Sequence, residues 1–361
     1  MKKLITKTSE KFLFDYLSNC SPTGFETAGQ KLWLDYILPF VDKYEADNYG
    51  SVYAIINPGC DYRVVIEAHA DEISWYVNYI TDNGFIHVIR NGGSDNIIAP
   101  SMRVKVHTDK GVLKGVFGWP AIHTRNGKEN TLQPTLENIF IDVGAKDKAE
   151  AEELGIHPGC VVTFEDGPMI INEKYYAGRA LDNRIGGFCI AEVAKMIKSS
   201  EVKLPFSLYI VNAVQEEVGL RGAEMAAANI KPNVAIITDV CHDTSTPHIQ
   251  AKKEGDIKCG KGPVLTFAPA VHNKLLSQIR EVAASKEIPY QLAASSRVTG
   301  TDTDAFAYSN GGVPSALISL PLRYMHTTVE MAHIEDVEHT ILLLFESVMS
   351  IKSGQSYRYI D

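Results

Sequence analysis

The sequence predicts an α/β fold interrupted by a β-rich module. From residue 179 onward, apolar runs of strand length alternate with helical patterns, which is typical of a mostly parallel sheet covered by helices. Between residues 74 and 170, short β-like runs alternate with turn signals. We therefore expect one α/β domain made of residues 1–73 and 171–361, with a β-rich domain of residues 74–170 inserted into it.

The N-terminal region combines helical and strand patterns. Residues 3–46 are predicted to be helical, in two segments separated by a loop at residues 21–24. Residues 51–56 and 63–67 are predicted to be strands on either side of a turn. We expect both strands to belong to the sheet of the α/β domain.

Individual elements can be predicted in the rest of the chain as well. Within the inserted module we expect a helix at 146–154 and strands at 85–89, 103–107, 115–118, 138–143 and 161–164. In the C-terminal part we expect strands at 206–214, 234–238 and 315–320, and helices at 185–197, 223–228, 274–285 and 336–350.

Composition excludes several classes of protein. Of the 361 residues, 45% are hydrophobic and 22% are charged, which excludes a disordered or low-complexity chain. A chain of this length buries roughly 75% of its unfolded surface, so it needs no disulfide staples. The 35 basic and 44 acidic residues give a net charge of −9, and no basic stripe interrupts the acidic background. Nucleic acid is therefore not an expected partner.

Targeting signals and cysteine usage indicate a cytoplasmic protein. The N-terminal lysines are followed by charged residues rather than by the apolar region of a signal peptide. No apolar stretch reaches the length that a membrane span requires, so no membrane partner is expected. The six cysteines include no CxxC pair, which favours reduced thiols over a disulfide framework or a cysteine-rich zinc site.

Acidic and histidine side chains follow the predicted strands of the α/β part. They are His69 and Asp71 after the strand at 63–67, Glu216 and Glu217 after 206–214, Asp239 after 234–238, His326 after 315–320, and Asp182 before the helix at 185–197. In open α/β sheets, ligand sites form outside the C-terminal ends of the strands. These residues are therefore candidates for one common site.

The residue types favour a transition-metal site. Two histidines with several carboxylates suit Zn²⁺, Co²⁺ or Mn²⁺ better than Ca²⁺, which prefers oxygen ligands. A carboxylate can bridge two ions ~3.5–4 Å apart, and such sites activate water for hydrolysis. The spacing of His69 and Asp71 lets the carboxylate hold the imidazole from behind. Of the adjacent Glu216 and Glu217, one can bind metal while the other acts as a general base.

Each of these motifs also has an ordinary structural explanation. A His-x-Asp pair is in most cases a hydrogen-bonded pair, and adjacent glutamates are usually solvated. A single Asp after a strand is often a helix N-cap. It is the joint placement at strand ends that indicates a site. The glycine pairs at 92–93 and 186–187 match no phosphate-binding motif, so a nucleotide is not indicated.

Segments along nearly the whole chain match the motifs of a known family. They are residues 21–26 (SPTGFE), 47–51 (DNYGS), 68–73 (AHADEI), 179–187 (RALDNRIGG), 215–223 (QEEVGLRGA), 238–240 (TDV), 300–305 (GTDTDA) and 323–330 (RYMHTTVE). With these segments the sequence resembles the tetrahedral (TET) aminopeptidases, family 42 of the metallopeptidases, which includes glutamyl, leucyl and deblocking aminopeptidases.

The resemblance implies a role for each candidate residue. Asp182 would bridge two metal ions, Zn²⁺ or Co²⁺ with Mn²⁺ as a further option. His69 and Asp239 would complete one metal site, and Glu217 and His326 the other. Glu216 would be the general base, and Asp71 would orient His69.

The resemblance also implies a fold, an activity and an assembly. The expected fold is a three-layer α/β/α catalytic domain with an inserted β-barrel-like dimerisation domain, and the expected assembly is a homo-oligomer of dimers that form a dodecamer. The expected activity is metal-dependent hydrolysis of N-terminal residues from short peptides. Two alternatives stay open: a deacylase that acts on N-acylated amino acids or blocked peptides with the same metal pair, and a catalytically inactive assembly protein. The preferred N-terminal residue and the native metal also stay open.

Overall fold

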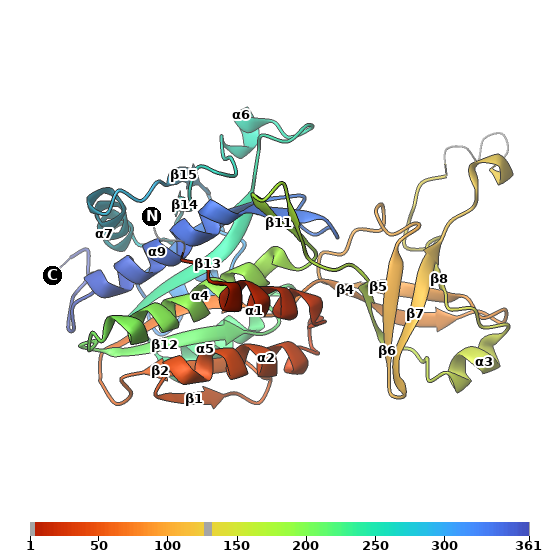
Figure 1. Cartoon of the computed structure of the whole chain (residues 1–361), viewed down its shortest axis with the longest axis horizontal. Helices are drawn as coiled ribbons and strands as arrows, with labels where there is room; N and C mark the ends of the chain where they lie inside the picture. Colours follow the sequence, from red (N-terminus) through yellow and green to blue (C-terminus); the bar gives the residue numbers. More distant parts are fainter. Residues whose placement is uncertain (1–3, 126–131, 361) are drawn as a thin grey trace.

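A large mixed sheet forms the centre of the α/β part of the chain (Figure 1). The computed structural model describes residues 4–125 and 132–360. Within these residues, eleven strands join the sheet, and nine of them follow the order β1-β2-β12-β3-β13-β16-β17-β11-β10, with β14 paired to β15 and β16. The strands are β1 (Lys43–Ala46), β2 (Val52–Ile56), β3 (Arg63–His69), β10 (Met169–Ile171), β11 (Tyr175–Gly178), β12 (Ser207–Ala213), β13 (Val234–His242), β14 (Val264–Phe267), β15 (Gln291–Ala294), β16 (Ser315–Arg323) and β17 (Glu330–His333).

The four central strands β12, β3, β13 and β16 are parallel to one another, as predicted. The flanking pairs β1–β2, β2–β12, β16–β17, β17–β11 and β11–β10 are antiparallel, so the sheet as a whole is mixed rather than mostly parallel. The central strands are nearly continuous apolar runs because helices cover both of their faces. Their C-terminal ends therefore meet along one edge of the sheet.

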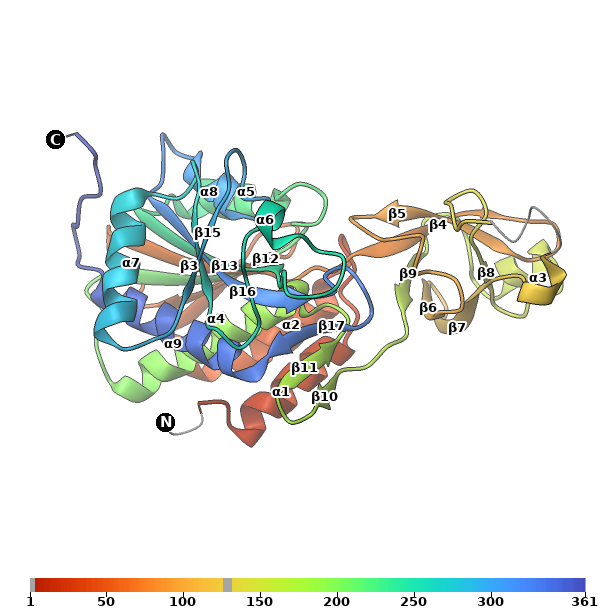
Figure 2. The same cartoon turned by 90° about the horizontal axis from the view of Figure 1, so that it is seen from above.

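Helices pack on both faces of this sheet, which gives three layers. Helices α1, α2 and α9 contact α4, which itself contacts β3 and β13; α5 and α8 contact each other and pack on β12 and on β13 and β16. Figure 2 shows α5 and α8 on the opposite side of the sheet from α4 and α9. The α-helices of the described residues are α1 (Lys7–Ser18), α2 (Thr27–Ile37), α3 (Lys148–Glu153), α4 (Leu181–Ser200), α5 (Arg221–Ile230), α6 (Ala251–Glu254), α7 (Asn273–Ser285), α8 (Thr303–Ala307) and α9 (Ile334–Ser350).

A separate β-barrel lies beside the α/β part (Figures 1 and 2). Its six antiparallel strands close in the order β4-β5-β8-β7-β6-β9. Side chains such as Trp75, Phe117 and Ile141 form a hydrophobic core of its own, distinct from the core of the large sheet. The strands are β4 (Ser74–Ile80), β5 (Ile86–Asn91), β6 (Arg103–Thr108), β7 (Gly111–Gly118), β8 (Phe140–Asp142) and β9 (Val161–Phe164). The predicted α/β fold with an inserted β-barrel-like module is confirmed.

One element of the N-terminal region differs from the prediction. Lys43–Ala46 is the edge strand β1 rather than the end of a helical region, and residue 3, where that region was predicted to begin, lies outside the described residues. All four side chains of β1 are exposed, because neither face of this edge strand is covered. The strand therefore carries no alternation of apolar and polar residues from which it could be predicted.

Several elements are also absent from the predictions. Strand β4 opens the barrel and is seven residues long, whereas β10, β11, β14, β15 and β17 are three or four residues long. Such short segments carry too few residues to display a periodicity. Among the described residues, no helix combines the length and the apolar character that crossing a membrane requires.

Candidate active site

The candidate residues converge at the C-terminal ends of the central parallel strands. His69 is the last residue of β3, and its register partner on β12 is Ala213, three residues before Glu216. Asp239 lies in the second half of β13. Asp182 lies in the first turn of α4, where its own backbone angles are not helical. The rule that ligands bind beyond the ends of parallel strands thus accounts for the location of the cluster.

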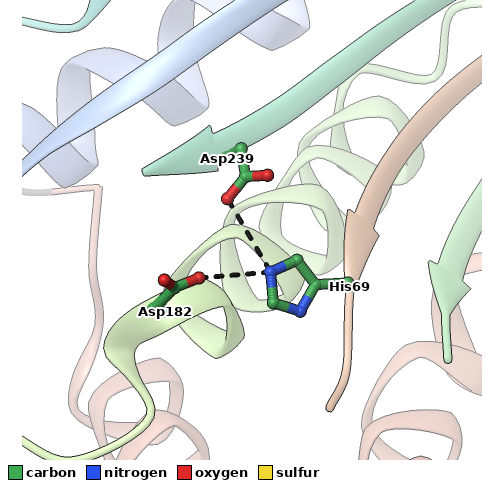
Figure 3. Close-up of side chains that lie close together, drawn as sticks. All are labelled: His69, Asp182 and Asp239. Atoms are coloured by element: carbon green, nitrogen blue, oxygen red, sulfur yellow. Dashed lines mark hydrogen bonds and ion pairs between the residues drawn. The ribbon is translucent and has the colours of Figure 1, made fainter. Parts of the chain in front are cut away.

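The first group of side chains consists of His69, Asp182 and Asp239, all of them buried (Figure 3). The Nε2 atom of His69 lies 3.1 Å from Oδ1 of Asp182 and 3.8 Å from Oδ1 of Asp239. Figure 3 shows both carboxylates directed at this one ring nitrogen. Three ligand atoms from three elements therefore face a common point.

The second group consists of Asp182, Glu217 and His326. The Nε2 atom of His326 lies 3.2 Å from Oδ2 of Asp182 and 3.3 Å from Oε1 of Glu217. Asp182 thus directs one carboxylate oxygen at His69 and the other at His326. This two-sided placement is the geometry that a bridging carboxylate requires.

Asp71 lies behind His69 and is completely buried. Its Oδ1 atom is 3.3 Å from Nδ1 of His69, a ring nitrogen without an aligned hydrogen bond to the described residues. The same carboxylate accepts hydrogen bonds from the backbone N–H groups of Glu216 (3.0 Å) and Glu217 (3.2 Å) and from the hydroxyl of Thr23 (2.9 Å). Asp71 therefore links the histidine of the first group to the glutamate pair.

Burial and mutual repulsion dominate the electrostatics of the carboxylates. Burial raises the pKa of the Glu216 carboxyl to about 10, and the neighbouring carboxylates of Asp302 and Asp239 add to this rise. Burial likewise raises the pKa of Asp239 well above its usual value, with a further contribution from Asp182. It also raises the pKa of Glu217. A cation among these carboxylates would compensate their charge and favour their ionised forms.

The two histidines are affected in the opposite sense. Although burial opposes its charged form, contacts with Asp182 and Glu217 raise the pKa of His326 to about 11. Although burial opposes its charged form, the hydrogen bond with Asp182 and the contact with Asp71 raise the pKa of His69 well above its usual value. In the protein alone, each imidazolium thus supplies the positive charge that a metal ion would otherwise provide.

The donor set fits divalent metal ions. In each of the two groups, the ligand atoms lie within 4.8 Å of one another, and a third combination joins His69 with Glu216 and Glu217. Imidazole nitrogens with carboxylate oxygens suit Zn²⁺, Co²⁺ and Mn²⁺. We expect a divalent cation to stabilise this buried cluster more than protons bound to its carboxylates and imidazoles do. One cation interacts with all the ligand atoms of a group at once.

A cavity of about 410 Å³ opens onto the cluster. Besides His69, Asp182, Glu216, Glu217, Asp239 and His326, it is lined by Val240, Cys241, His242, Thr299, Gly300, Thr301 and Met325. The side chain of Glu216 is only 11% exposed, and it lies 4.0 Å from Nε2 of His69. The cavity therefore offers a partly enclosed space in which a substrate would meet the glutamate and the metal-binding groups together.

Glu330 is a buried contact of the site that the sequence analysis did not single out. Its carboxylate accepts hydrogen bonds from the backbone N–H groups of Asp182 and His326. The residue ends the matched segment 323–330, which was its only signal in the sequence.

An ion-pair cluster around Glu72, also missed, supports the segment that leads to Asp182. Glu72 forms ion pairs with Arg179 and with Arg184, the second at 2.8 Å, and accepts a hydrogen bond from the backbone N–H of Ser21 (2.8 Å). The side chains of Glu72, Arg179 and Arg184 are at most 5% exposed. Arg179 and Arg184 also donate to backbone carbonyls at the end of α1, including that of Asn19. The cluster thus fixes the start of α4 against the N-terminal helix.

We expect Glu72→Gln to lower the free energy of unfolding by about 3–5 kcal/mol, because it leaves two buried guanidinium groups without their carboxylate. The arginines hold the pKa of Glu72 below its usual value despite burial. The ionised Glu72 carboxylate therefore stabilises the folded protein fully at pH values above its pKa in the unfolded chain. This stabilisation is lost as the pH falls through the lower pKa of Glu72 in the folded protein. Urea denaturation at several pH values measures both effects. The exposed Glu153→Gln is the control, and an equal effect of the two variants would contradict the expectation.

The chain matches the family model described as M42 glutamyl aminopeptidase over residues 50–343. It is 35% identical to the lysyl aminopeptidase of Pyrococcus furiosus over 325 residues, which cover 89% of this chain and 91% of that protein. Its fold is similar to the TET aminopeptidase of Thaumarchaeota archaeon SCGC AB-539-E09, with 29% identity, a TM-score of 0.90 and coverage of 95% and 97% of the two chains.

A further solved structure adds a quaternary arrangement. PhTET1-12s, a dodecamer, has a TM-score of 0.83 and 28% identity, with coverage of 94% of this chain and 98% of that chain. The family model, the relatives and the fold agree over most of the chain. The chain therefore belongs to the M42 glutamyl aminopeptidase family of metallopeptidases and is an aminopeptidase of that family.

Proposed function

We propose that the protein hydrolyses N-terminal residues from short peptides by means of two divalent metal ions, Zn²⁺ or Co²⁺ with Mn²⁺ as a further option. The observation that carries this proposal is the position of Asp182, whose two oxygens face two different histidines. His69, Asp182 and Asp239 would hold one ion. Asp182, Glu217 and His326 would hold the other.

Two divalent ions at this place would polarise the scissile carbonyl and stabilise the negative charge that develops on its oxygen. Glu216 acts as the general base. Its carboxylate takes a proton from the attacking water as the new C–O bond forms, and returns it to the leaving amine nitrogen as the C–N bond breaks. Asp71 keeps the ring of His69 in position and, through two backbone N–H groups, fixes the direction of Glu216 and Glu217.

The test of this proposal compares one peptide with a free and with an acetylated N-terminus. We expect release of the first residue from the free peptide alone, with Zn²⁺ or Co²⁺ added, and no release in the presence of a chelator. Release from the acetylated peptide would instead identify a deacylase. No release from either peptide by a folded, metal-loaded preparation would favour a catalytically inactive assembly protein.

We expect peptides that begin with Leu or Met to be hydrolysed at least about tenfold faster than peptides that begin with Glu or Lys. Apart from the candidate ligands and Glu216, the described lining of the cavity contains no Asp, Glu, Lys or Arg, and His242 lies at an exposed position. Within the described residues, this wall offers no guanidinium, ammonium or further carboxylate to pair with a charged side chain of the substrate. The free-energy cost of removing that charge from water would therefore not be compensated. Values of kcat/KM for matched peptides measure the preference. A peptide with Glu or Lys as the best substrate would refute it.

We also propose that residues 74–170 form a dimerisation domain and that dimers assemble into a dodecamer like PhTET1-12s. The barrel and its connecting segments carry exposed apolar side chains, among them Ile97, Val112 and Ile122, which are 65%, 56% and 71% exposed. Such side chains favour burial against another copy of the chain. Light scattering after size-exclusion chromatography would give a mass twelve times that of one chain.

The proposed location is the cytoplasm, whose reducing conditions suit the six free cysteines.

A further inference from the structure

We propose that Glu330 is a positioning residue that clamps two connections of the chain, the one from β11 into α4 that leads to Asp182 and the one from β16 to β17 that carries His326. One carboxylate oxygen of Glu330 accepts a hydrogen bond from the backbone N–H of Asp182 at 3.1 Å. The other oxygen accepts one from the backbone N–H of His326 at 2.7 Å. A single side chain thus holds the main chain of two residues that would bind the same metal ion. The inference rests on the metal site proposed above.

The topology explains why one residue can reach both connections. Strands β11 and β17 pair antiparallel, with Gly178 opposite Glu330, and they lie side by side near one end of the sheet, where β10 is the last strand (Figure 2). The chain leaves β11 at Gly178 toward Asp182, and it enters β17 at Glu330 after passing His326. Both connections therefore depart from the same end of this strand pair, and Glu330 lies at their common starting point.

The backbone is irregular at both anchored residues: Asp182 lies in the first turn of α4 with non-helical angles, and His326 lies in the loop between β16 and β17. Ala180, two residues before Asp182, has a φ of 59°, and His326 itself has a φ of 63°, so both residues adopt a left-handed conformation that costs free energy outside glycine. The side chain of His326 is 33% exposed, far more than that of His69 at 2%. The position of His326 thus depends on how firmly its backbone is anchored, and Glu330 supplies that anchor.

The burial and the contacts of Glu330 indicate a supporting role rather than direct metal binding. The residue is 2% exposed, where hydrogen bonds from N–H groups to a carboxylate are stronger than they are in water. Both of its oxygens are already directed at backbone N–H groups. In the described part of the chain, the groups of side chains close enough to share an ion do not include Glu330.

The experiment measures metal affinity in Glu330→Gln and Glu330→Asp. The amide of Gln has one acceptor oxygen and presents an NH₂ donor to the second backbone N–H, so one contact is lost. Asp keeps the charge but is one methylene shorter, so it does not span both amides. We expect Co²⁺ to bind each variant about 10–100-fold more weakly than it binds the wild type, and the Co²⁺ absorption spectrum to change because the coordination geometry relaxes. Glu335→Gln, an exposed residue five positions away, is the matched control.

The outcomes separate a clamp from other roles. Wild-type affinity and spectrum in both variants would refute the clamp. A loss in Glu330→Gln that Glu330→Asp restores would also refute it, since charge alone would then explain the effect. If the wild type itself binds no divalent ion, the proposed function fails rather than the clamp. If wild-type protein binds two ions per chain and only the Glu330 variants bind weakly, both stand.

Amide hydrogen exchange of the wild-type protein provides a readout that needs no variant. The backbone N–H of His326 lies in an irregular loop, where amides usually exchange quickly. The bond to Glu330 should slow its exchange by at least about tenfold relative to the exposed Tyr324 in the same loop. Equal exchange rates at the two positions would contradict the clamp, even if the variants proved too unstable to purify.

Discussion

Replacing Glu216 with Gln should lower turnover by about 10²–10⁴-fold while the protein still binds its metal ions. The amide of Gln has nearly the shape of the carboxylate, but it does not accept a proton from water. Because Glu216 is the proposed general base and not one of the five proposed ligands, its loss should leave metal content unchanged. Steady-state rates on a free N-terminal peptide, together with metal analysis of the dialysed protein, measure the two quantities.

The matched control for this variant is Glu224→Gln, which makes the same chemical change at an exposed position on α5. It should retain wild-type rates. A Glu216→Gln protein that retains near-full activity would show that another group takes the proton. A variant that loses its metal ions along with its activity would instead place Glu216 among the ligands, consistent with the group of His69, Glu216 and Glu217.

Replacing Asp182 with Asn should reduce both metal content and activity, with activity falling to the background of the assay. The two oxygens of Asp182 face His69 at 3.1 Å and His326 at 3.2 Å, so the carboxylate contributes to both proposed sites. The amide of Asn offers one oxygen and no charge, and it therefore serves one side at most. Elemental analysis after dialysis should find fewer than two ions per chain.

The exposed Asp61→Asn serves as the control for the Asp182 variant, because it removes the same charge far from the cluster. It should bind as many ions as the wild type. Two ions per chain in Asp182→Asn would show that the carboxylate does not bridge, and would remove the main structural argument for a paired site.

The location of the site could be predicted from the sequence because it depends on a short-range signal and one general rule. Apolar runs such as those before His69 and Asp239 mark buried strands, and parallel strands place their C-terminal ends together. No knowledge of the pairing order was needed. The division of the ligands between two groups did not follow from this rule, and only the family resemblance implied it.

The parts that could not be predicted depend on contacts between distant residues. Glu330 and Asp182 are 148 positions apart, and nothing in the local sequence around either residue indicates their hydrogen bond. The exposed strand β1 and the short strand β17 likewise form because the main sheet offers them a partner. Local pattern therefore predicts the central strands and the ends at which the site lies, while tertiary pairing decides the edges of the sheet and the supports of the site.

The most direct test of the two-metal account is anomalous X-ray diffraction from crystals of the wild-type protein loaded with Zn²⁺ or Co²⁺. The account predicts two peaks on opposite sides of the Asp182 carboxylate. One should lie next to His69 and Asp239, and the other next to Glu217 and His326. A single peak, or peaks away from these side chains, would contradict the central claim that Asp182 bridges a pair of catalytic ions.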